Sequence, residues 1–179
     1  SKLADIPSKK SKLFKKIPNL QRYLYTLRWS IASALTNTTM LEYLLQKHPN
    51  ATLAMSYFDG SDTLAHRFWL MRQPIKEIRA RLKGHNLDPR LAEELKARFG
   101  GILDNYYELI DEMVGRIQRA AGPNATIMLV SDHGWGKQNR NRALHRTVPF
   151  DGQHELEGIF IASGPHIKNG QFKQLSLYD

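Results

Sequence analysis

The chain has 179 residues, of which 41% are hydrophobic and 24% charged, and its formal net charge is +9. This composition is ordinary for a folded domain and excludes a fully disordered chain. There is no cysteine, so disulfides and thiolate metal sites are excluded, and any transition metal must bind histidine or carboxylate side chains. No apolar run approaches the length that spans a bilayer.

Much of the positive charge lies in two stretches, the Lys-rich residues 1–18 and the segment Arg67 to Arg90. A basic surface attracts anions such as nucleic acids, acidic lipids and phosphorylated substrates. We interpret residues 1–18 as a basic linker or cut end, and residues 19–179 as a partial domain. No nucleic-acid-binding motif accompanies the charge, so no specific nucleic-acid partner is expected. The sequence indicates neither a compartment, nor a membrane association, nor an oligomeric state.

In the first third of the chain the patterns predict two helical segments and a strand. Residues 20–34 have a weak helical pattern, and Thr39–Glu42 forms a capping box that predicts a short helix ending near Lys47. The apolar run at residues 51–58 predicts a buried strand of the kind found in parallel sheets. The strand is followed by a predicted turn at residues 59–62.

The rest of the chain alternates between helical and strand patterns. Asp88 followed by proline predicts a helix start, and that helix should end near Gly100. Residues 102–120 predict a strongly amphipathic helix, and residues 125–131 and 158–162 predict two further strands. Alternating helices and apolar strands indicate an α/β fold, an α/β/α sandwich with a mostly parallel central sheet. We expect the chain to hold only part of such a domain.

Acidic and histidine side chains follow the ends of the predicted strands. Asp62 and His66 follow the first strand, and their spacing of four residues places both on one face of a helical turn. Asp132 and His133 directly follow the second strand, and His154 shortly precedes the third. Ligands of open α/β sheets bind at the carboxyl ends of strands, so we expect these side chains to converge on one crevice. The alternatives are that Asp62 caps a helix beside an exposed His66, and that Asp132 only caps a turn.

Three segments, in this order, resemble the alkaline phosphatase superfamily, and in particular its type I phosphodiesterase/nucleotide pyrophosphatase family. The first segment is Tyr57–His66, which carries Asp62. The second is Val130–Gly134, with the sequence Val-Ser-Asp-His-Gly. The third combines Gly152-Gln-His154 with Gly158–Pro165. Each motif alone is modest, and the ordered set is specific.

The resemblance implies a site for two divalent metal ions, expected to be Zn²⁺. Asp62, His66 and His154 would hold one ion, and Asp132 and His133 would hold the other. It also implies hydrolysis of phosphodiester or nucleotide pyrophosphate bonds in a phosphorylated small molecule or nucleotide. Two ions in such a site clamp the attacking and leaving oxygens of an in-line displacement.

The chain departs from the family where the nucleophile is expected. The family completes the second ion with an upstream Asp and a Thr or Ser nucleophile, and neither is found here; Thr36, Thr38 and Thr39 fit helix capping better. No catalytic residue is therefore assigned. We expect the chain to be the C-terminal part of the catalytic domain and to be inactive in isolation.

Several interpretations remain open. Within the same superfamily the parent protein would also fit a phosphomonoesterase, a phosphonate hydrolase or a sulfatase. From other classes, a non-catalytic basic binding module and a pseudoenzyme both fit the charge or the fold. Basic residues between Asp132 and His154 predict either a phosphate-binding loop or a solvated one: Lys137, Arg140, Arg142 and Arg146. Aromatic residues near the first motif predict either nucleobase stacking or core packing: Tyr57, Phe58, Phe68 and Trp69.

Overall fold

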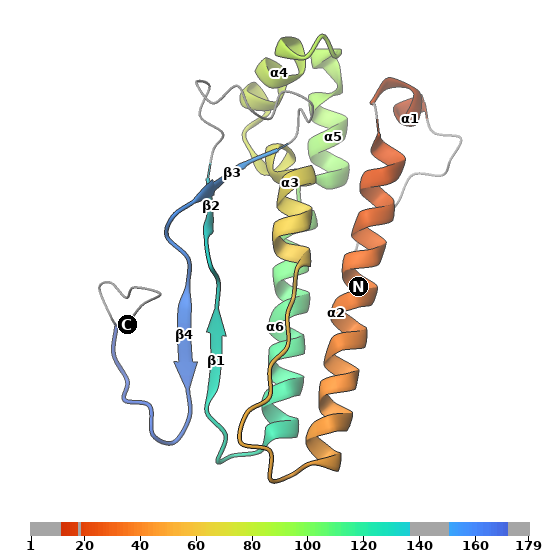
Figure 1. Ribbon diagram of the computed structural model, residues 1–179. Coiled ribbons are helices and arrows are strands. Elements are labelled where there is room, and N and C mark those ends of the chain that lie inside the picture. The colour runs from red at the N-terminus through yellow and green to blue at the C-terminus, as the bar shows by residue number, and fades with distance from the viewer. Residues whose placement is uncertain (1–11, 18, 137–150, 172–179) are drawn as a thin grey trace.

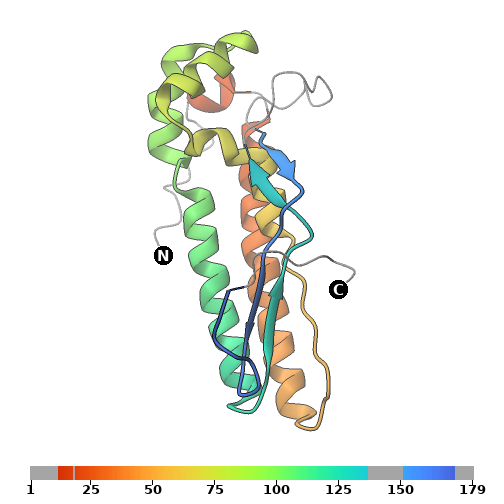
Figure 2. The ribbon, with the colours of Figure 1, turned by 90° about the vertical axis from the view of Figure 1, so that its left-hand side faces the viewer.

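The computed structural model of the protein describes residues 12–17, 19–136 and 151–171. Helices dominate, and two small sheets lie along one side of the helical part (Figures 1 and 2). The elements in chain order are α1 (Lys12–Lys16), α2 (Leu20–Lys47), α3 (Gly60–Arg72), α4 (Ile75–Gly84), η1 (Pro89–Leu91), α5 (Ala92–Phe99), α6 (Ile102–Ala121), β1 (Ile127–Val130), β2 (Gly134–Gly136), β3 (Gln153–Glu155) and β4 (Phe160–Ser163).

Helix α2 is a single helix of 28 residues, so the predicted break before Thr39 is wrong. Its buried positions recur every three or four residues from Leu20 to Leu41 and form one continuous stripe. Thr39 and Glu42 lie inside this helix, and Glu42 accepts a hydrogen bond from Arg116 Nε of α6 at 2.9 Å. Packing of α2 along α6 outweighs the local capping signal, because capping contributes only about 1 kcal/mol.

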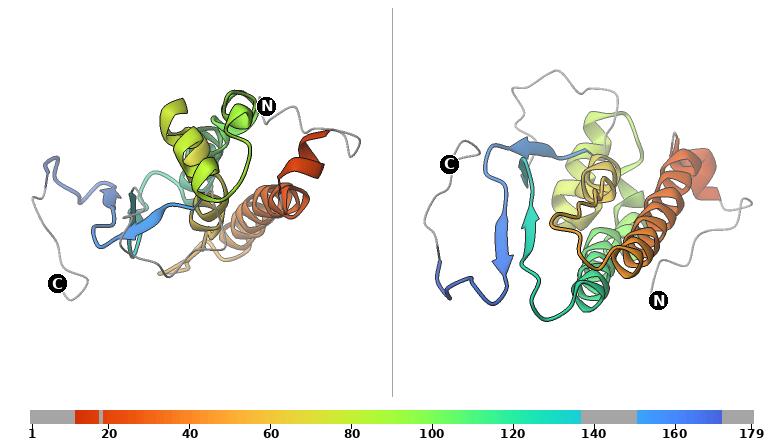
Figure 3. Two further views of the ribbon diagram at one scale, coloured as in Figure 1. Left: turned by 90° about the horizontal axis from the view of Figure 1, so that it is seen from above. Right: turned by 60° about the horizontal axis from the view of Figure 1, so that its bottom comes forward.

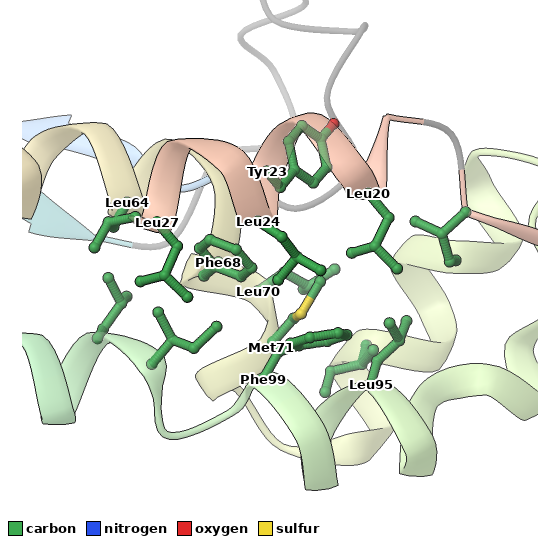
Figure 4. Packing of buried hydrophobic residues seen from close by; sticks show 14 of the residues in the cluster. Leu20, Tyr23, Leu24, Leu27, Leu64, Phe68, Leu70, Met71, Leu95 and Phe99 are labelled. Atoms are coloured by element: carbon green, nitrogen blue, oxygen red, sulfur yellow. The ribbon is translucent and has the colours of Figure 1, made fainter. Parts of the chain in front are cut away.

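The hydrophobic core lies between α2, α3, α5 and α6. Figure 4 shows side chains of α2 and α3 meeting those of α5 at its centre. Phe68 of α3 is 1% exposed and lies edge-on to Tyr23 of α2, with ring centroids 6.4 Å apart. Its ring also lies 6.1 Å from that of Phe99 on α5. Leu13 and Ile17 at the N-terminal end of the described chain join this core. The domain boundary at residue 18 stays a prediction.

The helix predictions for residues 88–120 are confirmed. Asp88 is the N-cap of η1, and its carboxylate accepts a hydrogen bond from the backbone N–H of Arg90 at 3.0 Å. Helix α5 then ends at Phe99, and α6 runs to Ala121. Gly122 follows with a φ of 85°, a value that glycine adopts readily, and the helix ends there. The amphipathic pattern predicted α6 because its buried stripe faces α2 and α3.

Both sheets are two-stranded and antiparallel, so the predicted mostly parallel central sheet is not found in the described residues. Strand β1 pairs with β4, with Met128 opposite Ala162, and β2 pairs with β3, with Trp135 opposite His154. The strand predictions near residues 125–131 and 158–162 are confirmed in position, but neither strand is fully buried. Met128 is 61% exposed on one face of the ladder, and Ile161, which pairs with Leu129, is 55% exposed on the other face.

Residues 51–58 form no strand, and residues 51–57 are exposed, so the predicted buried strand is wrong. The segment runs extended from the end of α2 to the start of α3 (Figure 1). Asn37 Nδ2 on α2 donates a hydrogen bond to the Tyr57 carbonyl at 3.1 Å. An apolar run becomes a buried strand only when a neighbouring strand satisfies its backbone groups, and no described strand lies alongside this one.

Three of the arginines in the stretch from Arg67 to Arg90 are paired with carboxylates. Arg72 forms an ion pair with Asp104 at 2.8 Å, Arg90 pairs with Asp88 at 3.0 Å, and Arg79 pairs with Glu93. These pairs reduce the free positive charge of this stretch. The predicted basic loop around residues 137–150 lies outside the described residues.

Within the described residues, none of the helices combines the length and the hydropathy needed to cross a membrane.

Candidate metal centre

Helix α3 places Asp62 and His66 on one face, as their spacing predicted. Asp62 lies in the first turn, where a carboxylate is favoured by the helix dipole. His66 Nε2 lies 3.6 Å from Asp62 Oδ1. The first residue of the helix, Gly60, is packed directly against Tyr106 and Ser30. Only glycine fits at this position, because any Cβ would overlap the Tyr106 hydroxyl. The two side chains are each about one-third exposed, 36% for Asp62 and 35% for His66.

The sheet formed by β2 and β3 brings two more histidines to α3 (Figures 1 and 3). His133 directly precedes β2, and His154 is the central residue of β3. Their rings are stacked, with centroids 3.8 Å apart and planes 17° from parallel. Pairing of two short strands therefore joins residues that are far apart in sequence.

The four side chains meet at one carboxylate oxygen, Asp62 Oδ1. His154 Nε2 lies 3.0 Å from this oxygen, and His133 Nε2 lies 3.5 Å from it. The ligand atoms of Asp62, His133 and His154 all lie within 4.8 Å of one another. His154 Nε2 also lies 3.2 Å from His66 Nε2. The structure therefore brings residues of both predicted Asp-His pairs together.

Asp132 lies at the rim of the cluster. Its side chain is 84% exposed, and the carboxylate oxygen Oδ1 lies 3.9 Å from His133 Nε2. Asp132 thus belongs to the same neighbourhood through His133, without reaching Asp62. Whether Asp132 binds a metal ion stays a prediction, as it does for the other four residues.

Asp151 is the member of the cluster that the sequence interpretation missed. It is 5% exposed, and its Oδ1 accepts a hydrogen bond from His66 Nδ1 at 2.9 Å. This hydrogen bond is the main reason that the pKa of His66 is raised above its ordinary value; burial opposes it, and the charges of Asp151 and Asp62 add to it. In sequence, Asp followed by Gly is typical of a turn, so the pattern gave no sign of a buried carboxylate.

Two tryptophans line one side of the cluster. Trp135 lies edge-on to His66 and His154, with ring centroids 4.7 and 4.8 Å away, and Trp69 lies 6.0 Å from Trp135. A Cβ on Gly152 would lie 2.6 Å from Trp69 and 2.8 Å from Trp135, so only glycine lets the backbone approach these rings. Of the aromatics near the first motif, Phe68 packs in the core, whereas Tyr57 is 77% exposed.

The donor atoms fit a divalent cation. Asp62 Oδ1 is buried and accepts no hydrogen bond from the described residues, although three imidazole nitrogens face it. In a tetrahedral zinc site with bonds of about 2.05 Å, neighbouring ligand atoms are about 3.3 Å apart. Among Asp62 Oδ1, His66 Nε2 and His154 Nε2 the separations are 3.6, 3.2 and 3.0 Å. Two imidazoles and a carboxylate also form a donor set that suits zinc.

The fold and the cluster define a mixed helix-and-strand protein with a histidine–carboxylate centre at the junction of a helical core and a small sheet. The type I phosphodiesterase / nucleotide pyrophosphatase family matches residues 13–175, and the chain belongs to this family. The family is a hydrolase family and implies phosphorylated or nucleotide substrates. No curated protein and no solved structure matches the chain.

Proposed function

We propose that this chain carries the metal-binding part of a hydrolase that cleaves phosphodiester or nucleotide pyrophosphate bonds with the help of two divalent cations. The observation that carries the proposal is the convergence of Asp62, His66, His133 and His154 on one point, in a chain that belongs to a phosphodiesterase and pyrophosphatase family. Buried polar groups that lack hydrogen bonds are costly, so an oxygen such as Asp62 Oδ1 favours a bound cation.

In this proposal the residues divide between two cations. Asp62, His66 and His154 hold one ion, since their donor atoms have the separations of one face of a tetrahedron. Asp132 and His133 hold the other, from the exposed side of the cluster. Bound cations of this kind supply positive charge to the oxygens of a phosphoester. With no cysteine in the chain, zinc fits the available oxygen and imidazole donors.

The tryptophans and Gly152 shape this site rather than react. Trp135 packs edge-on to His66 and His154 and covers one side of their rings. This contact holds the two imidazoles in place beside Asp62. The reacting nucleophile belongs, in this proposal, to the part of the parent protein upstream of this chain.

The test compares hydrolysis of bis(p-nitrophenyl) phosphate by the intact parent protein before and after chelation and with zinc restored. We expect chelation to abolish turnover and zinc to restore it. His154→Ala should lower kcat/KM by at least about 100-fold, since loss of a ligand exceeds the effect of losing a residue behind it. His166→Ala, at an exposed histidine after β4, is the matched control and should leave turnover unchanged.

Turnover that persists after thorough chelation, or in the His154→Ala variant, would contradict the proposal. Salt-sensitive oligonucleotide binding by a protein that contains no metal would instead favour the basic binding module. Faster hydrolysis of p-nitrophenyl phosphate than of the diester would indicate a phosphomonoesterase, and faster hydrolysis of a sulfate ester would indicate a sulfatase.

A further inference from the structure

We propose that Asp151 is a positioning residue that fixes the tautomer and ring orientation of His66, so that His66 presents the lone pair of Nε2 to the cation site. This inference rests on the proposed function for the identity of the site. It adds a residue that neither the motifs nor the family assignment singles out.

Asp151 is the one acidic residue that is buried in the described part of the chain. Burial of a carboxylate without a partner costs free energy, so a buried carboxylate is expected to have a hydrogen-bond partner nearby. Its partner is His66, at 2.9 Å from Asp151 Oδ1 to His66 Nδ1. A carboxylate only accepts hydrogen bonds, so Nδ1 must carry the proton in this contact.

The position of that proton determines what the other ring nitrogen can do. A neutral imidazole with its proton on Nδ1 has a bare lone pair on Nε2. The Nε2 atom of His66 faces Asp62 Oδ1 at 3.6 Å and His154 Nε2 at 3.2 Å, so the lone pair points to where the donor atoms converge. With the other tautomer an N–H would occupy this space and prevent coordination.

The backbone around Asp151 explains how the carboxylate is held in place. Gly152 is buried against Trp69 and Trp135, which fixes the chain directly after Asp151. Two residues later His154 reaches Asp62, so this short segment contacts α3 at both Asp62 and His66. Asp62 and His66 are neighbours on one helical face, and a rigid segment can therefore align both contacts together.

A competing explanation is that the Asp151–His66 contact only holds β3 against α3. In that case loss of the carboxylate would lower the stability of the protein but would not change its metal affinity. The variants Asp151→Asn and Asp151→Glu separate the two explanations. Asn keeps the size but can turn either an acceptor or a donor toward Nδ1, whereas Glu keeps the charged acceptor.

The first measurement is the tautomer of His66 in the metal-free protein, from the ¹⁵N NMR pattern of labelled histidine at a pH where the ring is neutral, assigned with His66→Gln. We expect the Nδ1–H form in the wild type and in Asp151→Glu, and a mixture with the Nε2–H form in Asp151→Asn. Observation of the Nε2–H form in the wild-type protein would overturn the inference, whatever the variants do.

The second measurement is Co²⁺ affinity, from visible absorption of the bound ion and competition with a chelator. Asp151→Asn should weaken binding by about 10- to 100-fold, the usual effect of removing a partner behind a ligand. Asp151→Glu should recover part of the loss, and Glu94→Gln, at an exposed carboxylate on α5, should change nothing. Circular dichroism and urea midpoints establish that each variant is folded.

The outcomes distinguish this inference from the proposed function. If the wild type binds Co²⁺ and a folded Asp151→Asn variant binds it equally well, the role of Asp151 is overturned and the metal site stands. If the wild type binds no Co²⁺, both are overturned. If Asp151→Asn does not fold, two other results test the inference. The Nδ1–H tautomer of His66 in the wild type, together with retained Co²⁺ affinity in Asp151→Glu, supports it. The Nε2–H tautomer in the wild type overturns it.

Discussion

The helical side and the strand side of the molecule differ in how completely they bury apolar residues. On the helical side, Leu27 and Phe68 are each 1% exposed. On the strand side, Met128 is 61% exposed, and in the extended segment before α3 Leu53 is 75% exposed. Helices that pack in pairs can bury a stripe between them, whereas a two-stranded ladder needs a further strand or helix on its other face.

The candidate metal centre lies where these two sides meet. Asp62 and His66 come from α3, which is anchored in the core by Leu64 and Phe68. His133 and His154 come from the strand side, and their Nε2 atoms lie next to Asp62 of α3. The difference indicates that Asp62 and His66 are positioned by the burial of α3, whereas His133 and His154 are positioned by strand pairing and ring packing.

The largest loss of stability is expected from a substitution at the centre of the helical core. Phe68→Ala removes a buried ring that contacts Tyr23 and Phe99, and should lower the free energy of unfolding by about 3–5 kcal/mol. The matched variant Phe160→Ala lies on β4, where the side chain is 45% exposed, and should cost less than about 1 kcal/mol. Urea denaturation measures both. Equal losses would show that the strand side is as well packed as the core.

An intermediate effect tests the start of α3, which positions Asp62. Gly60→Ala places a Cβ against the Tyr106 hydroxyl and 2.9 Å from Ser30 Cβ, so it should destabilise the protein by about 1–3 kcal/mol. Gly84→Ala is the matched control, because nothing lies within 4 Å of its Cβ. Thermal unfolding should show Gly84→Ala unchanged or stabilised by about 0.5–1 kcal/mol. A neutral Gly60→Ala variant would refute the close packing of α3 on α6.

The smallest effect concerns pH and the contact between α2 and α6. The hydrogen bond from Arg116 lowers the pKa of Glu42 below its ordinary value. A carboxyl whose folded pKa is depressed contributes stability that is present above its unfolded pKa and is lost as pH falls through the folded value. Glu42→Gln should therefore flatten the fall in urea midpoint below about pH 4.5, the ordinary value of a glutamate.

Arg116→Met provides the second half of this test. It removes the same hydrogen bond from the other side, so it should abolish the same pH-dependent component of stability. The double variant should add no further flattening, since both changes remove one interaction. If the fall in urea midpoint at low pH survives in both single variants, it arises from other carboxyl groups.

Local patterns predicted the parts of this protein that local forces decide. The amphipathic period of residues 102–120 predicted α6, because one stripe of a helix must face a partner wherever that partner lies. The Asp88 cap and the helical spacing of Asp62 and His66 were also correct, since both depend on residues within one turn. The order of the strand-end motifs indicated the family and the convergence of Asp62, His133 and His154.

The tertiary structure decided what depends on distant partners. Because α2 packs against α6, it continues as one helix past the capping box at Thr39–Glu42, where the sequence pattern predicted the start of a new helix. Residues 51–58 have the composition of a buried strand, yet a strand also requires a neighbour for its backbone, and the described residues supply none. Asp151 could not be assigned from its sequence, because its partner His66 lies 85 positions away and is reached only through the fold.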